Sequence, residues 1–195
     1  LWIQHVIVMI LEPIIAGSSY PMSFSSFPGR GSLKGQRAIR RWIESGKGIR
    51  NFAQADIRHF YSHIQYKIVR KKLERRVKDN FFLHLIDVCM TYFPKEMPLG
   101  FYLSQWLANF MLQELDYDIK CKLKIAHHVR YMDNYTLADD NKKKLHQALL
   151  YIRQVLGKMR LRMKSDWQVF RFEYTKKNGK KTHITSCIAH SPKIA

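Results

Sequence analysis

Apolar residues recur along this chain at two different spacings, which predict both helices and strands. Spacings of three and four residues predict helices over residues 1–16, 33–45, 65–78, 81–92, 101–118 and 139–156. Alternating or short continuous apolar runs predict strands over 52–60, 127–138, 167–174 and 180–188, the second of these being a hairpin. A chain that passes from strand to helices, then to a hairpin, a helix and a strand is typical of an α+β fold. We therefore expect a small antiparallel sheet with helices packed on one face.

Local signals set the ends of these segments. Residues 17–32 are rich in Ser, Pro and Gly and predict a connection, with Ser32 as the cap of the following helix. Asn178 and Gly179 predict a tight turn between the last two strands. Polar residues and a proline interrupt the apolar run of 1–16, so we expect a buried helix there and no membrane span.

The net charge says more about the partners of this protein than its length or composition does. The chain has 34 Lys and Arg against 15 Asp and Glu, a net charge of +19, and 13% of its residues are aromatic. A positive field of this size attracts polyanions, and nucleic acid is the first candidate. Composition alone leaves a ribosomal or a membrane-surface protein open. The three scattered cysteines favour a cytoplasmic protein.

Two aspartates lie in similar apolar surroundings at the predicted ends of strands. Asp56 belongs to the acidic site toward the end of the strand predicted over 52–60, and Asp133 lies at the tip of the hairpin 127–138. Taken singly, each residue is more simply explained as a turn residue. Together, two carboxylates on rigid strands can hold the divalent cations that phosphoryl transfer requires. We therefore expect the two side chains to converge.

Three segments, in their order along the chain, resemble motifs A, B and C of reverse transcriptases. They are Ala55-Asp56-Ile57-Arg58-His59-Phe60-Tyr61, Pro98-Leu99-Gly100-Phe101-Tyr102-Leu103-Ser104-Gln105 and Tyr131-Met132-Asp133-Asn134. The resemblance covers about residues 27–169 and implies the fingers and palm of a reverse transcriptase. Three domains are then expected: an N-terminal helix and fingers (1–50), a palm with interleaved fingers helices at 67–98 (51–175), and a C-terminal hairpin (176–195). The family's thumb is not recognisable.

The resemblance assigns roles around the two aspartates. Asp56 and Asp133 would be ligands of Mg²⁺ or Mn²⁺, together with the backbone carbonyl of Ile57. Tyr61 would be the aromatic gate under the sugar that selects deoxynucleoside triphosphates, although plain core packing also explains a tyrosine there.

Motif B indicates a subclass. The form Leu99-Gly100-x-x-x-Ser104-Gln105 resembles that of diversity-generating retroelements and related bacterial enzymes, where group II intron relatives have Gln-Gly-x-x-x-Ser-Pro. Gly100 would let the backbone approach the new base pair. Leu99 would place an aliphatic group beside the nucleotide, and Gln105 would belong to the same site. A helix that simply begins after a glycine is the alternative explanation.

Basic residues would hold the nucleic acid and the triphosphate. Arg30, Lys34 and Arg37 lie where the family's fingers present cations to the triphosphate, although a solvated basic face explains them equally well. The helix 67–78 and the lysines at 120–124 and 142–144 would contact an RNA template and a DNA or RNA primer through phosphates. An accessory protein or structured RNA is left open.

The hairpin tip departs from the family pattern. Reverse transcriptases usually have Tyr-x-Asp-Asp, and this chain has Asn134 at the last position, where an amide oxygen can still coordinate a cation more weakly. The sequence therefore predicts an RNA-directed DNA polymerase that extends a primer by two-metal nucleotidyl transfer, weakened by Asn134. The alternative is a catalytically impaired RNA-binding or phage-defence protein that retains the fold.

Overall fold

A computed structural model describes residues 2–45, 49–91, 97–98 and 100–171, together with the backbone of 176–177 and 180–181. Its helices are α1 (Trp2–Gly17), α2 (Ser32–Glu44), α3 (Phe60–His63), α4 (Tyr66–Leu73), α5 (Asn80–Thr91), α6 (Tyr102–Tyr117) and α7 (Lys142–Lys158), with a π-helical turn η1 (Asp118–Lys122) after α6. Its strands are β1 (Asn51–Asp56), β2 (His127–Tyr131), β3 (Asn134–Asp139), β4 (Gln168–Arg171), β5 (Lys176–Lys177) and β6 (Lys180–Lys181).

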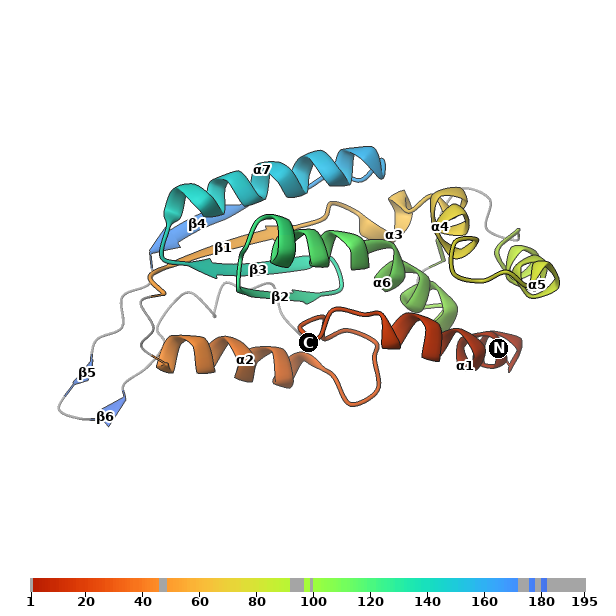
Figure 1. Cartoon of the computed structure of the whole chain (residues 1–195), viewed down its shortest axis with the longest axis horizontal. Helices are drawn as coiled ribbons and strands as arrows, with labels where there is room; N and C mark the ends of the chain where they lie inside the picture. The colour runs from red at the N-terminus through yellow and green to blue at the C-terminus, as the bar shows by residue number, and fades with distance from the viewer. Residues whose placement is uncertain are drawn as a thin grey trace.

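The four longer strands form one antiparallel sheet in the order β2-β3-β1-β4. Helix α7 lies along this sheet (Figure 1), and its apolar residues Leu145, Leu149 and Ile152 are buried. The predicted α+β class is confirmed. Strands β5 and β6 pair with each other, Lys176 opposite Lys181, on either side of the predicted Asn178-Gly179 turn, which itself lies outside the described residues.

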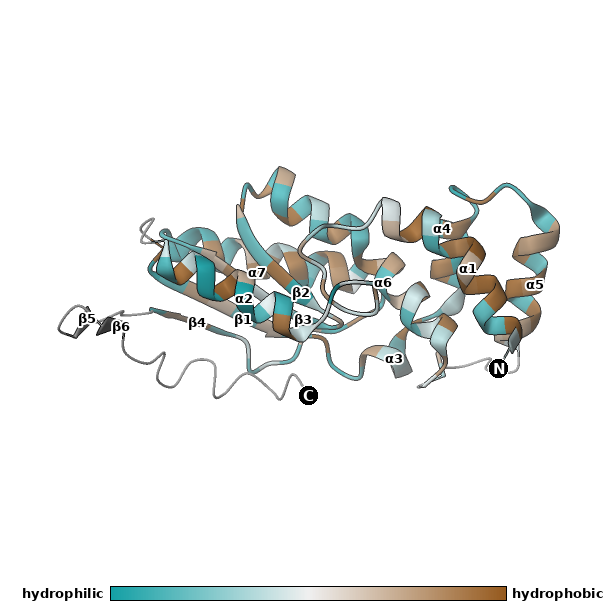
Figure 2. Ribbon diagram, turned by 90° about the horizontal axis from the view of Figure 1, so that it is seen from below, coloured by the Kyte–Doolittle hydropathy of each residue, from teal (hydrophilic) through white to brown (hydrophobic). Residues whose placement is uncertain are grey.

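Helix α6 is the centre of the molecule. Twelve of its sixteen residues are buried, so it is enclosed on nearly every side, and α1 packs along it. The sheet, α2 and α7 lie toward one end of the molecule, while α1, α4 and α5 lie toward the other (Figures 1 and 2). The carboxyl end of β1 points toward this second, helical part. The fold thus places the end of β1 at the junction of the two parts.

Several segment ends differ from the sequence prediction. The strand predicted over 52–60 ends at Asp56, because the chain then turns and His59 adopts a left-handed φ of 46° before α3 begins. Ser32 is the first residue of α2 and not its cap, since Gly31 holds that position without a side-chain hydrogen bond. The cap of α7 is Asn141, whose side chain accepts hydrogen bonds from the amides of Lys143 and Lys144.

Helix α1 is only half buried, which corrects the expectation of a buried helix. Its buried face contains Ile7, Val8, Leu11 and Ile15, while Trp2 and Met9 on the other face are 87% and 72% exposed. Much of the exposed face is apolar as well, and the ribbon of α1 is largely brown in Figure 2, with a few polar positions. In the part of the chain that the structure describes, none of the helices has the length and apolar character needed to cross a bilayer.

Candidate active site

Asp56 and Asp133 come together at the end of the sheet. Asp56 is the last residue of β1 and lies opposite Asn134 of β3, so Asp133, one residue earlier, falls beside it. The amide of Ile57 donates to the backbone carbonyl of Asp133 over 3.3 Å, and the two carboxyl groups are close enough for the charge of Asp56 to act on Asp133. The expected convergence is therefore found.

The turn that carries Asp133 is strained. Tyr131 pairs with Asn134, so Met132 and Asp133 are the two central residues of a tight hairpin. Such turns normally have glycine where φ is positive, but here Met132 has a φ of 54°. A left-handed non-glycine residue costs about 1–2 kcal/mol. The surrounding structure must therefore hold this turn in place.

Burial and mutual repulsion change the ionisation of the pair. Burial, followed by the negative charge of Asp56, raises the pKa of Asp133 from 3.8 to about 6. Two adjacent carboxylates that resist joint ionisation without a counter-charge are suited to binding a divalent cation, which would favour the fully ionised pair.

Lys164 is a third member of the site, which the sequence did not predict. Its Nζ donates to Oδ2 of Asp56, and its amide donates to the backbone carbonyl of Asp56 over 2.8 Å. The ladder between β1 and β4 ends at Gln54 and Gln168, and an isolated bridge between Ile57 and Met163 then brings Lys164 beside Asp56. No motif marks this lysine in the sequence, because only the return of the chain after α7 places it there. The ion pair is open to solvent, since the Lys164 side chain is 42% exposed.

The site has free ligand capacity for a cation. Oδ1 of Asp56 is buried and has no hydrogen-bond partner, an arrangement that is costly unless something else coordinates it. Among the described residues no group of three His, Cys, Asp or Glu side chains converges. Mg²⁺ characteristically uses one or two protein carboxylates and takes its remaining ligands from water and substrate phosphates. The two aspartates therefore fit Mg²⁺ or Mn²⁺, and a cation would compete with Lys164 for Asp56.

Removing the Lys164 charge should raise the pKa of Asp133 further. The Lys164 ammonium lowers that pKa, so in Lys164→Met the metal-free protein should titrate Asp133 above about pH 6. Carboxyl ¹³C chemical shifts followed against pH measure this directly. Lys158→Met, which removes a lysine from the end of α7, is the matched control and should leave the titration unchanged; an unchanged titration in Lys164→Met would mean that the lysine does not act on the pair.

Tyr61 and Asn134 border the two aspartates. Tyr61 lies in α3, and its hydroxyl donates to the sulfur of Met132 over 3.2 Å. Burial, followed by the charge of Asp133, raises the pKa of Tyr61 to about 12, so the phenol stays neutral. Asn134 is partly buried at the start of β3, directly opposite Asp56. Both side chains are thus beside the carboxylates, as the sequence predicts, while their roles in binding remain predictions.

The motif B residues differ in their backbone conformation and in their contacts. Leu99 lies outside the described residues. Gly100 has a φ of 87°, so this position requires glycine for its backbone alone. Gln105, on the first turns of α6, accepts a hydrogen bond from the hydroxyl of Ser26 over 3.1 Å. Gln105 therefore supports the loop that connects α1 and α2.

The three cations assigned to the triphosphate differ in availability. The Arg30 guanidinium donates to the carbonyls of Tyr20 and Ser23 over 2.9 and 3.0 Å and lies over the Phe27 ring, so it also supports the α1–α2 loop. Lys34 donates to the carbonyl of Gly29. Arg37 is exposed on α2. Arg30 is thus the one whose contacts indicate a structural role.

Some of the lysines and arginines predicted to bind nucleic acid form ion pairs within the protein. On α4 and the turns after it, Lys67, Lys71 and Arg76 are exposed. Other predicted channel residues have partners, for example Lys72 with Glu114 at 2.9 Å and Lys144 with Asp139 at 2.7 Å. The exposed cations remain candidates for phosphate contacts.

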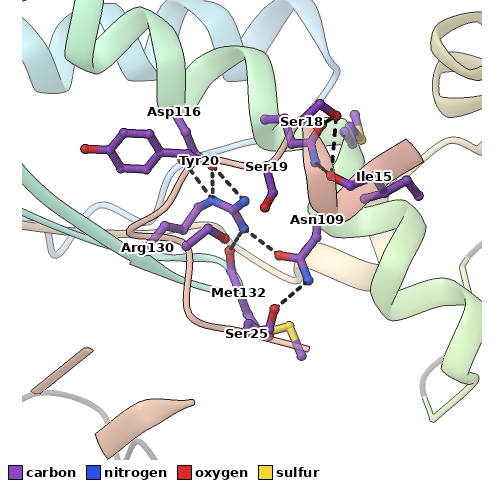
Figure 3. Close-up of polar contacts among 12 residues, drawn as sticks. Ile15, Ser18, Ser19, Tyr20, Ser25, Asn109, Asp116, Arg130 and Met132 are labelled. Carbon is purple, nitrogen blue, oxygen red and sulfur yellow. Dashed lines mark hydrogen bonds and ion pairs between the residues drawn. The ribbon is translucent and has the colours of Figure 1, made fainter. Parts of the chain in front are cut away.

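A buried ion pair lies directly behind the strained turn (Figure 3). Arg130 and Asp116 are both fully buried, and the Arg130 guanidinium donates to both carboxylate oxygens of Asp116 over 2.8–2.9 Å. Burial alone would lower the pKa of Arg130, but the charge and hydrogen bonds of Asp116 outweigh burial and raise it, so the arginine stays charged. No local pattern in the sequence indicates this pair, because a charged residue in a basic chain predicts a surface position and not a core position.

The chain belongs to the reverse transcriptase family. The family model described as "Reverse transcriptase (RNA-dependent DNA polymerase)" matches residues 2–180, and the convergence of Asp56 with Asp133 on an antiparallel sheet agrees with it. No match is found among curated proteins.

Solved structures with the same fold include telomerases from two Candida species. Apo telomerase from Candida tropicalis superposes with a TM-score of 0.64 at 11% identity, over 88% of this chain and 36% of that one. Telomerase from Candida albicans, in complex with a TWJ fragment of telomeric RNA, gives a TM-score of 0.64 at 12% identity, over 88% and 35%. The chain thus spans about a third of the length of these telomerase chains.

Proposed function

We propose that this chain is the catalytic part of an RNA-directed DNA polymerase, which extends a DNA or RNA primer on an RNA template with deoxynucleoside triphosphates. The observation that carries the proposal is the convergence of Asp56 and Asp133, with one buried carboxylate oxygen lacking a partner. Membership of the reverse transcriptase family and the net charge of +19 support it.

Each residue of the site would have a separate role in the reaction. Asp56 and Asp133 would hold Mg²⁺ or Mn²⁺, with the carbonyl of Ile57 as a further ligand. Such ions, when bound, activate the primer hydroxyl and stabilise the charge on the leaving pyrophosphate. Tyr61, neutral and held by Met132, would lie under the sugar and exclude a 2′-hydroxyl. Exposed cations such as Arg37 would attract the triphosphate.

The subclass proposed is that of bacterial reverse transcriptases related to diversity-generating retroelements. It rests on the form Leu99-Gly100-x-x-x-Ser104-Gln105 and not on the fold. The left-handed backbone at Gly100 supports a glycine-dependent approach to the base pair. The telomerase from Candida albicans was solved with RNA, which agrees with an RNA template for this chain.

Two observations favour a second candidate. Asn134 is neutral where the family pattern has an aspartate, and Lys164 already neutralises Asp56. The site therefore offers cations less negative charge than three free aspartates would. A chain that binds RNA without extending a primer would show this pattern.

Primer extension separates the two candidates. The purified chain is incubated with a labelled primer on an RNA template, deoxynucleotides and Mg²⁺ or Mn²⁺. The polymerase proposal expects extended DNA with either ion or both. RNA binding that weakens steeply with salt, without extension under any condition, would support the binding protein instead.

The metal requirement should depend on pH. Because the pKa of Asp133 is raised to about 6, the site is fully ionised only above that pH. Below about pH 6, the Mn²⁺ concentration for half-maximal extension should rise about tenfold per pH unit, since one proton competes with the ion. Extension rates measured from pH 5 to 8 at a series of Mn²⁺ concentrations test this. A metal requirement that is constant across this range would contradict it.

A further inference from the structure

We propose that Arg130 is the positioning residue of the catalytic hairpin: it holds the strained turn so that the Asp133 carboxylate faces Asp56. The proposal rests on the function proposed above, because it concerns the same cation site. Arg130 itself lies out of reach of solvent and would touch neither the cation nor the substrate.

The contacts of the guanidinium join the core to the turn. Beyond its bonds to Asp116, Arg130 donates from Nη1 to the side-chain oxygen of Asn109 over 2.9 Å and to the backbone carbonyl of Met132 over 2.9 Å (Figure 3). Met132 is the left-handed residue, and its carbonyl begins the peptide unit that leads into Asp133. A single planar group thus bonds the core of the protein to the backbone immediately before the catalytic carboxylate.

The base of this connection is rigid. Asp116 and Asn109 both belong to α6, the most enclosed helix of the structure. The Asn109 amide donates in turn to the carbonyl of Ser25 over 3.2 Å, and the backbone of Arg130 pairs with Met22 and Phe24 over 3.0 and 2.9 Å. The side chain and the backbone of Arg130 are therefore both fixed before the turn begins, and the turn has little freedom to relax.

A local requirement explains why an arginine is needed. The turn has a methionine where glycine is normal, so relaxation of φ would rotate the Met132 carbonyl and move the next residue, Asp133. Holding the carbonyl requires a donor that reaches past Asp116. Arginine offers five donors in a planar fork, whereas the lysine ammonium is a single point that cannot satisfy the same partners together.

The test measures Mn²⁺ binding without nucleic acid or nucleotide, by the EPR signal of free Mn²⁺. Arg130→Lys keeps the buried positive charge beside Asp116 and removes the fork. We expect Mn²⁺ to bind this variant about 10–100-fold more weakly than it binds the wild type, as for other residues that orient metal ligands. Arg153→Lys, an exposed arginine of α7, is the matched control and should bind as the wild type does.

A second variant tests the proposal independently, so that it can still be decided if Arg130→Lys does not fold. Arg130→Met combined with Asp116→Leu removes both buried charges, which proteins often tolerate, and should show the same loss of Mn²⁺ affinity. Circular dichroism confirms that each variant tested is folded. Wild-type Mn²⁺ affinity in either folded variant would overturn the proposal, because a merely structural arginine would change the melting temperature alone. If Asp133→Ala binds Mn²⁺ as the wild type does, the cation site itself is wrong and the proposed function fails.

Discussion

Replacing Asp133 with asparagine should abolish primer extension, with a loss of about 1,000-fold or more, because the change removes one of two carboxylates that would hold the cations. Such a loss corresponds to about 4 kcal/mol of transition-state stabilisation. The substitution is nearly isosteric, so the turn and the hydrogen bond from Ile57 to the backbone of residue 133 should remain. Gel-based extension under single-turnover conditions is the measurement.

The control for this prediction removes a carboxylate just beyond the same hairpin. Asp140→Asn changes an exposed residue just after β3 and should leave extension within about twofold of the wild type, as surface substitutions usually have small effects. Asp133→Asn should also not lower the melting temperature at pH 8. The pKa of Asp133 is raised on folding from 3.8 to about 6, so the fold loses stability as the pH rises through that interval, and at pH 8 removal of the carboxylate relieves the whole cost. Unchanged extension in Asp133→Asn would exclude the assignment.

Truncating one member of the buried ion pair should have the largest effect on stability. Arg130→Ala leaves the Asp116 carboxylate in the core without its partner, and Asp116→Ala leaves the Arg130 guanidinium likewise. Breaking a buried pair in this way costs about 3–5 kcal/mol. For a domain of this size we expect the melting temperature to fall by about 6–20 °C.

Thermal unfolding followed by circular dichroism measures this effect. The matched control is an exposed pair, Arg75 with Glu114 at 3.9 Å, where Arg75→Ala should change the melting temperature by no more than a degree or two. A similar small effect for Arg130→Ala would mean that the two buried charges do not depend on each other.

The sequence was sufficient for the parts of the site that follow from local pattern. Asp56 and Asp133 each lie at the end of an apolar segment, and divalent cations in phosphoryl transfer need carboxylates held together on rigid strands, so their convergence could be predicted. The α+β class followed from the order of helical and alternating segments for the same reason.

The remainder depended on tertiary contacts that no local pattern encodes. Lys164 reaches Asp56 only because the chain returns beside β1 after α7, 108 residues later in sequence. Arg130 and Asp116 read as ordinary surface charges until the fold buries them against each other. Arg30 was assigned to the triphosphate from its position near a glycine-rich turn, but its guanidinium bonds to two loop carbonyls instead.

The central claim is that Asp56 and Asp133 share a divalent cation, and a crystal structure of the protein soaked in Mn²⁺ tests it most directly. We predict an anomalous peak about 2.0–2.2 Å from Oδ1 of Asp56 and from a carboxylate oxygen of Asp133, with Lys164 moved away from Asp56. Mn²⁺ bound elsewhere, with Lys164 still on Asp56 and both carboxylates without metal, would contradict the account.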